Sequence, residues 1–444
     1  MARQRKAGSG GRRTTRRTFL AAATVVAVAG SWPRNLARAE TAYTPAGMAV
    51  FDDLMERFME EHRPPGASLA VTHKGRLVHA RGYGMANVEE KEPVEPTSLF
   101  RIASLSKPFT SAAVLRLKQQ GKLTLDDRVF EVLGLASYLE EHPSTDARLR
   151  DVRIRHCLQH TGGWDRGKSI DPMGARAAFR IARELGVELP IETKHIIRFM
   201  LDQPLDTEPG TAYAYSNFGY CLLGRVIEAY SGKSYGQFVD EEVLKPIGIR
   251  HMRLGKNLFE DRAPGEVTYY DSGGRTGRAV SGPNIGEPAP LPYGVEMLET
   301  MDANGGWIAS AVDLVRFASA LDDPKRCKLL DEATMLAMLA PPEGPVGHVP
   351  DGSPRPSYYG CGWSVQPSRR ARGRYTKSHF GMLAGSSTVL TCRADGTNWA
   401  ALFNSDADGE GRQFAGLIDS LLRQTTRQIR EWPKGDLFET YGGE

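Results

Sequence analysis

Apolar residues follow a helical rhythm and then an alternating one at the start of the folded part of the chain. They recur three and four positions apart over residues 46–63, the spacing of one buried helix face. Pro64 ends this pattern, and from residue 66 to 83 apolar and polar positions alternate on both sides of Lys74-Gly75. Alternation with period two is typical of half-buried strands. The segment therefore predicts a helix followed by a β-hairpin.

Helical spacing returns at Ser104, where a helix should begin, and dominates residues 120–290, with Pro and Gly between the helices. Residues 263–297 are rich in Gly and Pro and predict a long loop beside the active site. Alternating patterns near the C-terminus predict strands, followed by a helix with one apolar face from Phe414 to Ile429. The expected strands are 359–365, 375–380, 386–392 and 399–404.

This order of elements predicts the fold class. A helix and hairpin come first, strands and a helix come last, and helices lie between them. We expect an α/β (α+β) fold with an antiparallel sheet flanked by helices and an inserted, mainly helical lobe. The α/β lobe would comprise about residues 45–119 and 291–435, and the helical lobe about residues 120–290. A groove between the lobes is where a pocket would form.

The first 39 residues have the features of an export signal. They contain nine Lys or Arg and no Asp or Glu, with a twin-arginine pattern over residues 15–20. A weakly apolar stretch runs from Phe19 to Gly30, and Ala37-Arg38-Ala39 has the form of a cleavage site. Residues 1–39 are therefore predicted to be a twin-arginine signal peptide, and residues 40–444 the mature domain in the periplasm or outside the cell. A basic tail or an uncleaved anchor is the alternative.

Charge and cysteine content exclude several classes of function. Removing the nine basic residues of the signal from the total of 57 leaves 48 against 53 acidic residues. A net charge near −5 for the mature chain does not favour nucleic acid or an anionic membrane as partner. No second stretch approaches the ~20 apolar residues of a membrane span. The five cysteines are scattered without a C-x-x-C pattern, so we expect mostly free thiols, with a Cys361–Cys392 bridge as an open alternative.

The strongest chemical signal is the pair Ser104 and Lys107. Residues three apart share one face of a helix, so the amine can reach the hydroxyl. A serine hydroxyl is a weak nucleophile unless a neighbouring group takes its proton. Because Ser and Lys are common, the pair alone is weak evidence.

Two further motifs follow at a suitable distance and in a suitable order: Tyr215-Ser216-Asn217 and His379-Phe380-Gly381. Together the three motifs resemble those of the serine β-lactamase and penicillin-binding-protein superfamily. The most similar branch contains class C β-lactamases, DD-peptidases and related esterases. The resemblance extends from about Met48 to Asn404 and includes residues 121–127, 154–163, 304–306 and 313–314.

The resemblance implies roles for the first two motifs. Ser104 would be the acylated nucleophile and Lys107 its proton partner. The Tyr215 phenol would lie near both, with the lysine charge stabilising a phenolate that accepts the serine proton. Asn217 would hydrogen-bond Lys107 or a substrate amide.

The third motif should lie on a strand at the edge of the groove. The oxyanion hole would use the backbone N–H groups of Ser104 and Met382, and Gly381 would let the backbone approach the substrate. His379 stands where many relatives have lysine, and it would be mostly neutral at pH 7. Lys377 shares its strand face, so we expect that it restores a positive charge near the substrate.

The sequence therefore predicts an exported serine hydrolase that forms an acyl-enzyme on ester or amide bonds, of the esterase or D-amino-acid peptidase type. We expect a small-molecule or peptide substrate, with cell-wall peptides among the candidates, and neither a metal nor an organic cofactor. One alternative is a penicillin-binding DD-peptidase or a β-lactamase. Another is a slowly deacylating β-lactam-binding or sensor protein. The oligomeric state does not follow from the sequence.

Two other patterns compete with this interpretation. Residues 232–236 fit the G-x-S-x-G elbow with Ser234 as nucleophile, but a helical pattern precedes them where a strand is required. His156 and His160 are spaced like metal ligands, yet no acidic third ligand accompanies them. We expect all three residues to be structural.

Overall fold

The computed structural model describes residues 48–369, 371 and 373–441. The predicted twin-arginine signal and its cleavage site lie outside these residues. Across the described part of the chain, no helix is both long enough and apolar enough to cross a bilayer.

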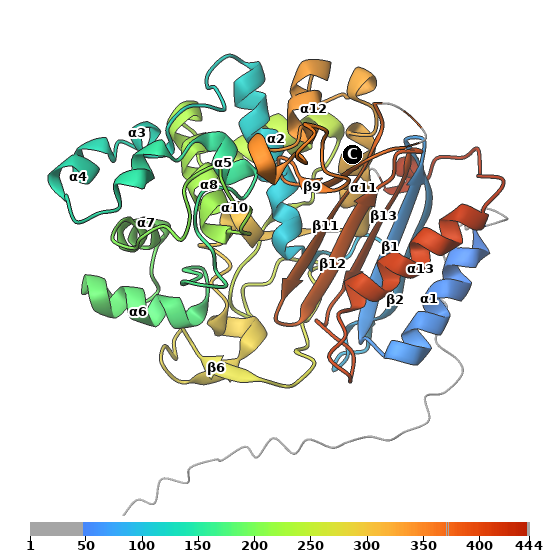
Figure 1. Cartoon of the computed structure of the whole chain (residues 1–444). Helices are drawn as coiled ribbons and strands as arrows, with labels where there is room; N and C mark the ends of the chain where they lie inside the picture. Colours follow the sequence, from blue (N-terminus) through green and yellow to red (C-terminus); the bar gives the residue numbers. More distant parts are fainter. Residues whose placement is uncertain (1–47, 370, 372, 442–444) are drawn as a thin grey trace, which may run out of the picture. The chain divides into compact units, whose positions relative to one another are not determined.

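An eight-stranded antiparallel sheet forms the centre of the fold, in the order β3-β2-β1-β13-β12-β11-β10-β9 (Figure 1). The N-terminal strands are β1 (Gly66–His73), β2 (Arg76–Asn87) and β3 (Glu92–Pro93). The C-terminal strands are β9 (Tyr358–Tyr359), β10 (Ser364–Pro367), β11 (Tyr375–Leu383), β12 (Ser386–Cys392) and β13 (Thr397–Phe403). The predicted hairpin therefore pairs with the last strand of the chain, with Ala67 opposite Phe403.

Helices cover both faces of this sheet. On one face α1 (Ala49–His62) and α13 (Phe414–Gln428) lie side by side (Figure 1) and pack on residues of β1, β12 and β13. On the other face α11 (Ala311–Ala320) contacts β1 and β13, and α2 (Ser106–Gln119) belongs to the same hydrophobic core. The second face is therefore the one that carries the predicted nucleophile segment.

The middle of the chain is mainly helical, as predicted. It contains α3 (Val129–Val132), α4 (Ala136–Glu141), α5 (Ile154–Leu158), α6 (Ala175–Leu185), α7 (Thr193–Leu201), α8 (Asn217–Ser231) and α9 (Tyr235–Val239). Helix α8 is largely buried and contacts α2, α5 and α10 (Asp302–Gly305). A small sheet of β4 (Phe100–Arg101), β8 (Trp307–Ala309) and β5 (Arg253–Leu254) lies beside the nucleophile segment. The remaining helices are α12 (Glu332–Leu339) and α14 (Phe438–Tyr441).

The predicted fold class is confirmed, and two local elements differ from expectation. The strand expected over 359–365 is split into β9 and β10, because Gly362 has a φ of +80° and turns the chain between them. The loop expected over 263–297 contains a two-stranded sheet of β6 (Thr276–Arg278) and β7 (Pro288–Pro290). All five cysteines are free, so the Cys361–Cys392 bridge is absent. The division into two lobes at the predicted boundaries stays a prediction.

Candidate active site

Ser104 lies on a 3₁₀ turn, Ala103–Leu105, that leads directly into α2. The helix expected to begin at Ser104 thus starts with this tighter turn, and α2 itself begins at Ser106. The preceding backbone is fixed from the sheet: Thr388 Oγ1 donates to the Ile102 carbonyl at 3.0 Å and Ser386 Oγ to the Arg101 carbonyl at 2.6 Å. Strand β12 therefore holds the segment that presents Ser104.

Lys107 is completely buried, and its Nζ contacts three oxygen atoms. These are Ser104 Oγ at 3.1 Å, Asn217 Oδ1 at 2.9 Å and the Asn304 carbonyl at 2.7 Å. Burial lowers the pKa of Lys107 well below its usual value of 10.5; the charge of Asp171 opposes this shift, and the charge of Arg166 adds to it. Both amide oxygens can only accept, so a neutral amine spends its two N–H bonds on them. In the neutral form its lone pair is then left to accept from the Ser104 hydroxyl, whereas a protonated amine donates to Ser104 Oγ as well.

Asn217 is the first residue of α8, whose N-cap Ser216 accepts a hydrogen bond from Gly219 N–H at 3.3 Å. The Asn217 amide connects Lys107 to Asp171, because its Nδ2 donates to Asp171 Oδ2 at 2.9 Å while its Oδ1 accepts from Lys107. This second contact fixes which end of the amide faces the lysine.

The Tyr215 ring lies close to the amine of Lys107 and to the guanidinium of Arg166. Its centroid is 4.9 Å from Lys107 Nζ and 4.8 Å from Arg166 Cζ. Burial raises the pKa of Tyr215, and a hydrogen bond with Ser104 and the charge of Arg166 offset this only in part. Burial thus favours the neutral forms of both the Tyr215 phenol and the Lys107 amine, and the phenolate stabilised by a lysine charge stays a prediction.

His379, Gly381 and Met382 all lie on β11, where β10 no longer covers the strand. The β10 pairing ends at Ser378, so residues 379–383 form an open edge. A Cβ at Gly381 would stand 2.3 Å from both the Ile102 carbonyl and Thr388 Oγ1. Only glycine permits this close approach to the nucleophile segment.

The ring of His379 is buried and neutral, as predicted. Its Nδ1 lies 2.8 Å from the Phe380 carbonyl, which can only accept, so Nδ1 carries the proton. Its Nε2 then accepts from the Tyr359 hydroxyl at 2.8 Å. Burial and the charge of Lys107 lower the pKa of His379 to about 3.

The expectation for Lys377 is wrong. The side chain does share a strand face with His379, but it is buried and its Nζ donates to the Leu321 carbonyl at 2.9 Å. That carbonyl lies just beyond the C-terminal end of α11, where backbone carbonyls attract a cation. The charge of Lys377 is thus directed away from the open edge of β11.

The competing candidates have structural contacts. Ser234 is the N-cap of α9, and its hydroxyl accepts from Gln237 N–H at 3.3 Å. His160 Nδ1 accepts from Ser216 N–H at 3.2 Å, and His156 Nδ1 accepts from Arg153 N–H at 3.2 Å. Within the described residues, no group of three or more His, Cys, Asp or Glu side chains is arranged to hold a metal ion.

Sequence reasoning missed four neighbours of the site: Arg166, Asp171, Asn304 and Tyr359. Arg166 and Asp171 lie in a loop without a motif, and Asn304 acts through its backbone carbonyl. Asn304 falls in a segment that the resemblance covered, so only its role was undetected. Tyr359 was assigned to a strand, and nothing local links it to His379.

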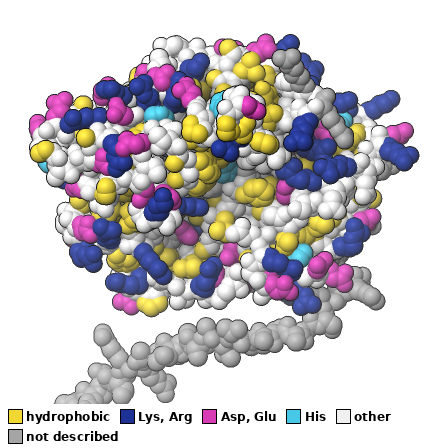
Figure 2. Space-filling model, viewed as in Figure 1, with side chains coloured by type: hydrophobic (Ala, Val, Ile, Leu, Met, Phe, Trp, Pro, Cys, Tyr) yellow, Lys and Arg dark blue, Asp and Glu magenta, His cyan; other side chains and the backbone are white. Residues whose placement is uncertain are grey.

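Figure 2 shows basic and acidic side chains interspersed over most of the visible face, with hydrophobic side chains gathered near its middle. No broad area of one charge dominates this view.

Comparison with known proteins gives the context for this geometry. A family model described as Beta-lactamase matches residues 51–422. The chain is 29% identical to Penicillin-binding protein 4* of Bacillus subtilis (strain 168) over 344 residues, which cover 76% of this chain and 67% of that protein. The match covers between 38% and 61% of the length of several other curated relatives.

Solved structures share the architecture. EstCE1, "a hydrolase with promiscuous acyltransferase activity", superposes with a TM-score of 0.63 at 22% identity, covering 85% of this chain and 97% of that one. The D-amino acid amidase from Ochrobactrum anthropi SV3 gives a TM-score of 0.61 at 21% identity, covering 86% and 97%. At these identities the likeness establishes a common fold.

Proposed function

Because the chain belongs to the β-lactamase family and is a serine hydrolase of the β-lactamase and penicillin-binding-protein superfamily, we propose that it hydrolyses ester or amide bonds through an acyl-enzyme on Ser104. The observation that carries this proposal is the contact set of Lys107 Nζ. Two of its partners can only accept hydrogen bonds, and the third is the hydroxyl to be activated.

In the proposed reaction Lys107 takes the Ser104 proton as Oγ attacks the substrate carbonyl carbon. The carbonyl oxygen becomes an oxyanion that accepts from the N–H groups of Ser104 and Met382. One such donor is typically worth about 3 kcal/mol in the transition state. The Tyr215 phenol, hydrogen-bonded to Ser104, donates a proton to the leaving group and recovers it from the water that cleaves the acyl-enzyme. Lys107 returns its proton to Ser104 Oγ as that oxygen leaves the acyl carbon.

The charges of the site favour an esterase or D-amino-acid peptidase over a β-lactamase. A lysine in the third motif would pair with a substrate carboxylate, whereas His379 is neutral and Lys377 is bound elsewhere. The hydrolase EstCE1 and the D-amino acid amidase are neighbours in fold, which is consistent with either activity. The substrate would be a small molecule or a peptide, including cell-wall peptides.

Intact mass spectrometry tests the proposal. The protein is exposed separately to p-nitrophenyl acetate and to benzylpenicillin and followed over time, together with Ser104→Ala and the matched control Ser234→Ala. We expect rapid ester turnover, lost only in Ser104→Ala. A persistent penicillin adduct with little ester turnover would instead indicate a penicillin-binding peptidase or sensor. Full turnover by Ser104→Ala would refute the acyl-enzyme.

We also propose export by the twin-arginine route, on the strength of residues 15–20 and 37–39. In a bacterial host with this pathway, the exported protein should begin at Glu40 by N-terminal sequencing. Replacing Arg16 and Arg17 together by lysine should retain the protein inside the cell. Unchanged export of this variant would contradict the proposal.

A further inference from the structure

The open edge of β11 continues past the proposed oxyanion donor. Strands β11 and β12 are joined by the two-residue turn Ala384-Gly385, and Leu383 pairs with Ser386. In a two-residue hairpin the flanking pair exchanges hydrogen bonds, and alternate residues then point their N–H groups away from the partner strand. The Met382 N–H therefore points out from the open edge, and the N–H of Ala384, two residues further on in the turn, points toward Glu296.

A carboxylate stands at the second of these N–H groups. Glu296 Oε1 accepts from Ala384 N–H over a long distance, 3.5 Å. Its other oxygen, Oε2, has no hydrogen-bond partner among the described residues, and the side chain is half-buried. No Lys, Arg or His in the described chain forms an ion pair with Glu296.

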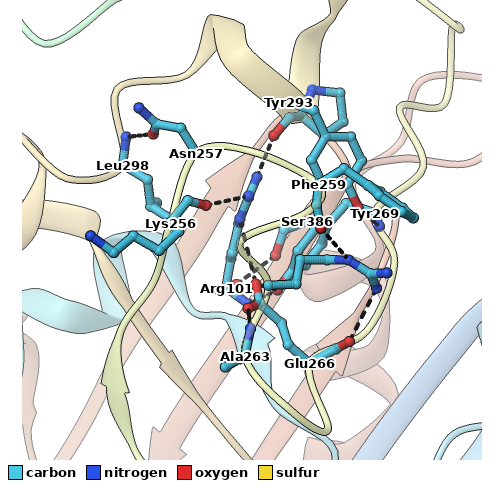
Figure 3. Close-up of polar contacts among 12 residues, drawn as sticks. Arg101, Lys256, Asn257, Phe259, Ala263, Glu266, Tyr269, Tyr293, Leu298 and Ser386 are labelled. Atoms are coloured by element: carbon cyan, nitrogen blue, oxygen red, sulfur yellow. Dashed lines mark hydrogen bonds and ion pairs between the residues drawn. The ribbon is translucent and has the colours of Figure 1, made fainter. Parts of the chain in front are cut away.

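The segment that carries Glu296 is anchored on both sides. The buried Arg101 guanidinium donates to the carbonyls of Pro292 and, at 2.7 Å, of Lys256, and it stacks on Tyr269 (Figure 3). On the other side, the Asn257 side-chain oxygen accepts from Leu298 N–H, as Figure 3 also shows. The backbone on both sides of Glu296 is thus fixed beside the edge of β11.

The surroundings leave the charge of Glu296 largely uncompensated. Burial raises its pKa, and the charges of Arg101 and Arg275 offset the effect only in part. Arg275 is already paired with Asp271 and Asp406, and Arg101 with two carbonyls and with Glu266 at 3.8 Å. A carboxylate in this position gains from an incoming cation.

We propose that Glu296 is a specificity-determining residue that binds an ammonium group on the acyl part of the substrate, so that the preferred substrates are amino-acyl esters or amides. When the substrate carbonyl oxygen accepts from Met382 N–H, an ammonium group on the carbon next to the carbonyl lies roughly 3 Å from that oxygen. Depending on how the substrate is oriented, the ammonium points toward Ala384 or away from it. In one of these orientations it falls between the oxyanion site and Glu296, which are separated by about two residues of strand. The inference rests on the proposed acyl-enzyme function and names its substrate class.

The test compares two anilides of nearly equal shape. Alanine p-nitroanilide, as separate D and L forms, carries the ammonium, and isobutyryl p-nitroanilide replaces it with a methyl group. Each is assayed with the wild type, Glu296→Gln and the control Glu299→Gln. Glu299 is exposed and makes no hydrogen bond or ion pair with a described residue, and glutamine at 296 keeps an acceptor for Ala384. Thermal unfolding checks that all three proteins are folded.

We expect the wild type to prefer the better alanyl enantiomer over the isobutyryl anilide by about 10-fold or more in kcat/KM. Glu296→Gln should lower kcat/KM for that alanyl substrate about 10- to 100-fold and leave the isobutyryl anilide within about threefold. Glu299→Gln should change neither. Equal effects of Glu296→Gln on both anilides, or no preference in the wild type, would overturn the inference. It would also be overturned if p-nitrophenyl acetate alone acylates Ser104, an outcome that leaves the proposed function intact. Failure of all substrates to acylate Ser104 would refute both.

Discussion

Gly381→Ala is the substitution whose effect can be worked out most directly from the structure. The new methyl would stand 2.3 Å from the Ile102 carbonyl and 2.3 Å from Thr388 Oγ1, whereas ordinary contact begins at 3.4 Å. To remove this overlap, the new methyl group and the two oxygen atoms must therefore move about 1 Å apart. Ile102 is buried and hydrogen-bonded to both Trp307 and Thr388, so it cannot retreat alone. Strand β11 must move away from the turn that carries Ser104.

That movement separates Met382 N–H from the nucleophile. Loss of one oxyanion donor lowers kcat by about 10²- to 10³-fold. Overpacking at this site should also lower the free energy of unfolding by about 1–3 kcal/mol.

The assay is hydrolysis of p-nitrophenyl acetate, with urea unfolding measured on the same samples. Gly416→Ala in α13 is the matched control, since a Cβ there meets nothing within 4 Å, and it should retain full activity. Wild-type kcat in a stably folded Gly381→Ala protein would refute the requirement for close approach and weaken the assignment of Met382 as donor.

Three further predictions concern protons and charge. Because acylation needs the neutral amine of Lys107, kcat/KM for a neutral ester should rise with pH through the lowered pKa of this residue and level off well below pH 10.5. A single rise centred near pH 10.5 would contradict this. His379, with a pKa of about 3, should add no step to the profile above pH 5. Asp171→Ala releases the Asn217 amide, so kcat/KM for the ester should fall about 5- to 30-fold. Asp171→Asn keeps a hydrogen-bond acceptor, so its kcat/KM should fall less. Equal losses in both variants would argue against a positioning role of Asp171. Arg101→Leu removes the partner of buried carbonyls and of Glu266, so urea unfolding should report a loss of about 3–5 kcal/mol, and an unchanged midpoint would show that the cluster is not needed.

The elements that the sequence predicted well are those with a local physical cause. Alternation over residues 66–83 corresponds to β1 and β2, and the apolar face after Phe414 corresponds to α13. The contact between Ser104 and Lys107 follows from the spacing of three residues at a helix start, and the structure places their side-chain atoms 3.1 Å apart. Such features depend on residues within one turn or one strand.

What the sequence did not reveal depends on segments that meet only in the folded chain. Asn304 contributes a backbone carbonyl to Lys107, which has no signature in residue type. The strand alternation gave the correct face for Lys377, but not the presence of the Leu321 carbonyl that binds its amine. Asp171 is 46 residues from Asn217, in a loop whose path cannot be inferred from periodicity.

The hydrogen bonds from Ser386 and Thr388 to the backbone before Ser104 span 285 and 286 residues of chain. The pairing of β1 with β13 joins segments that are even further apart in the sequence, with Ala67 opposite Phe403. Contacts of such high sequence separation carry a large loop-closure entropy and form late, so this topology should fold slowly. A chain that has been synthesised only as far as the helices already contains Ser104, Lys107 and Tyr215, but lacks the strand that orders the turn before them. Hydrolytic activity should therefore appear only when the C-terminal strands have docked, so that during synthesis or refolding it reports completion of the whole domain.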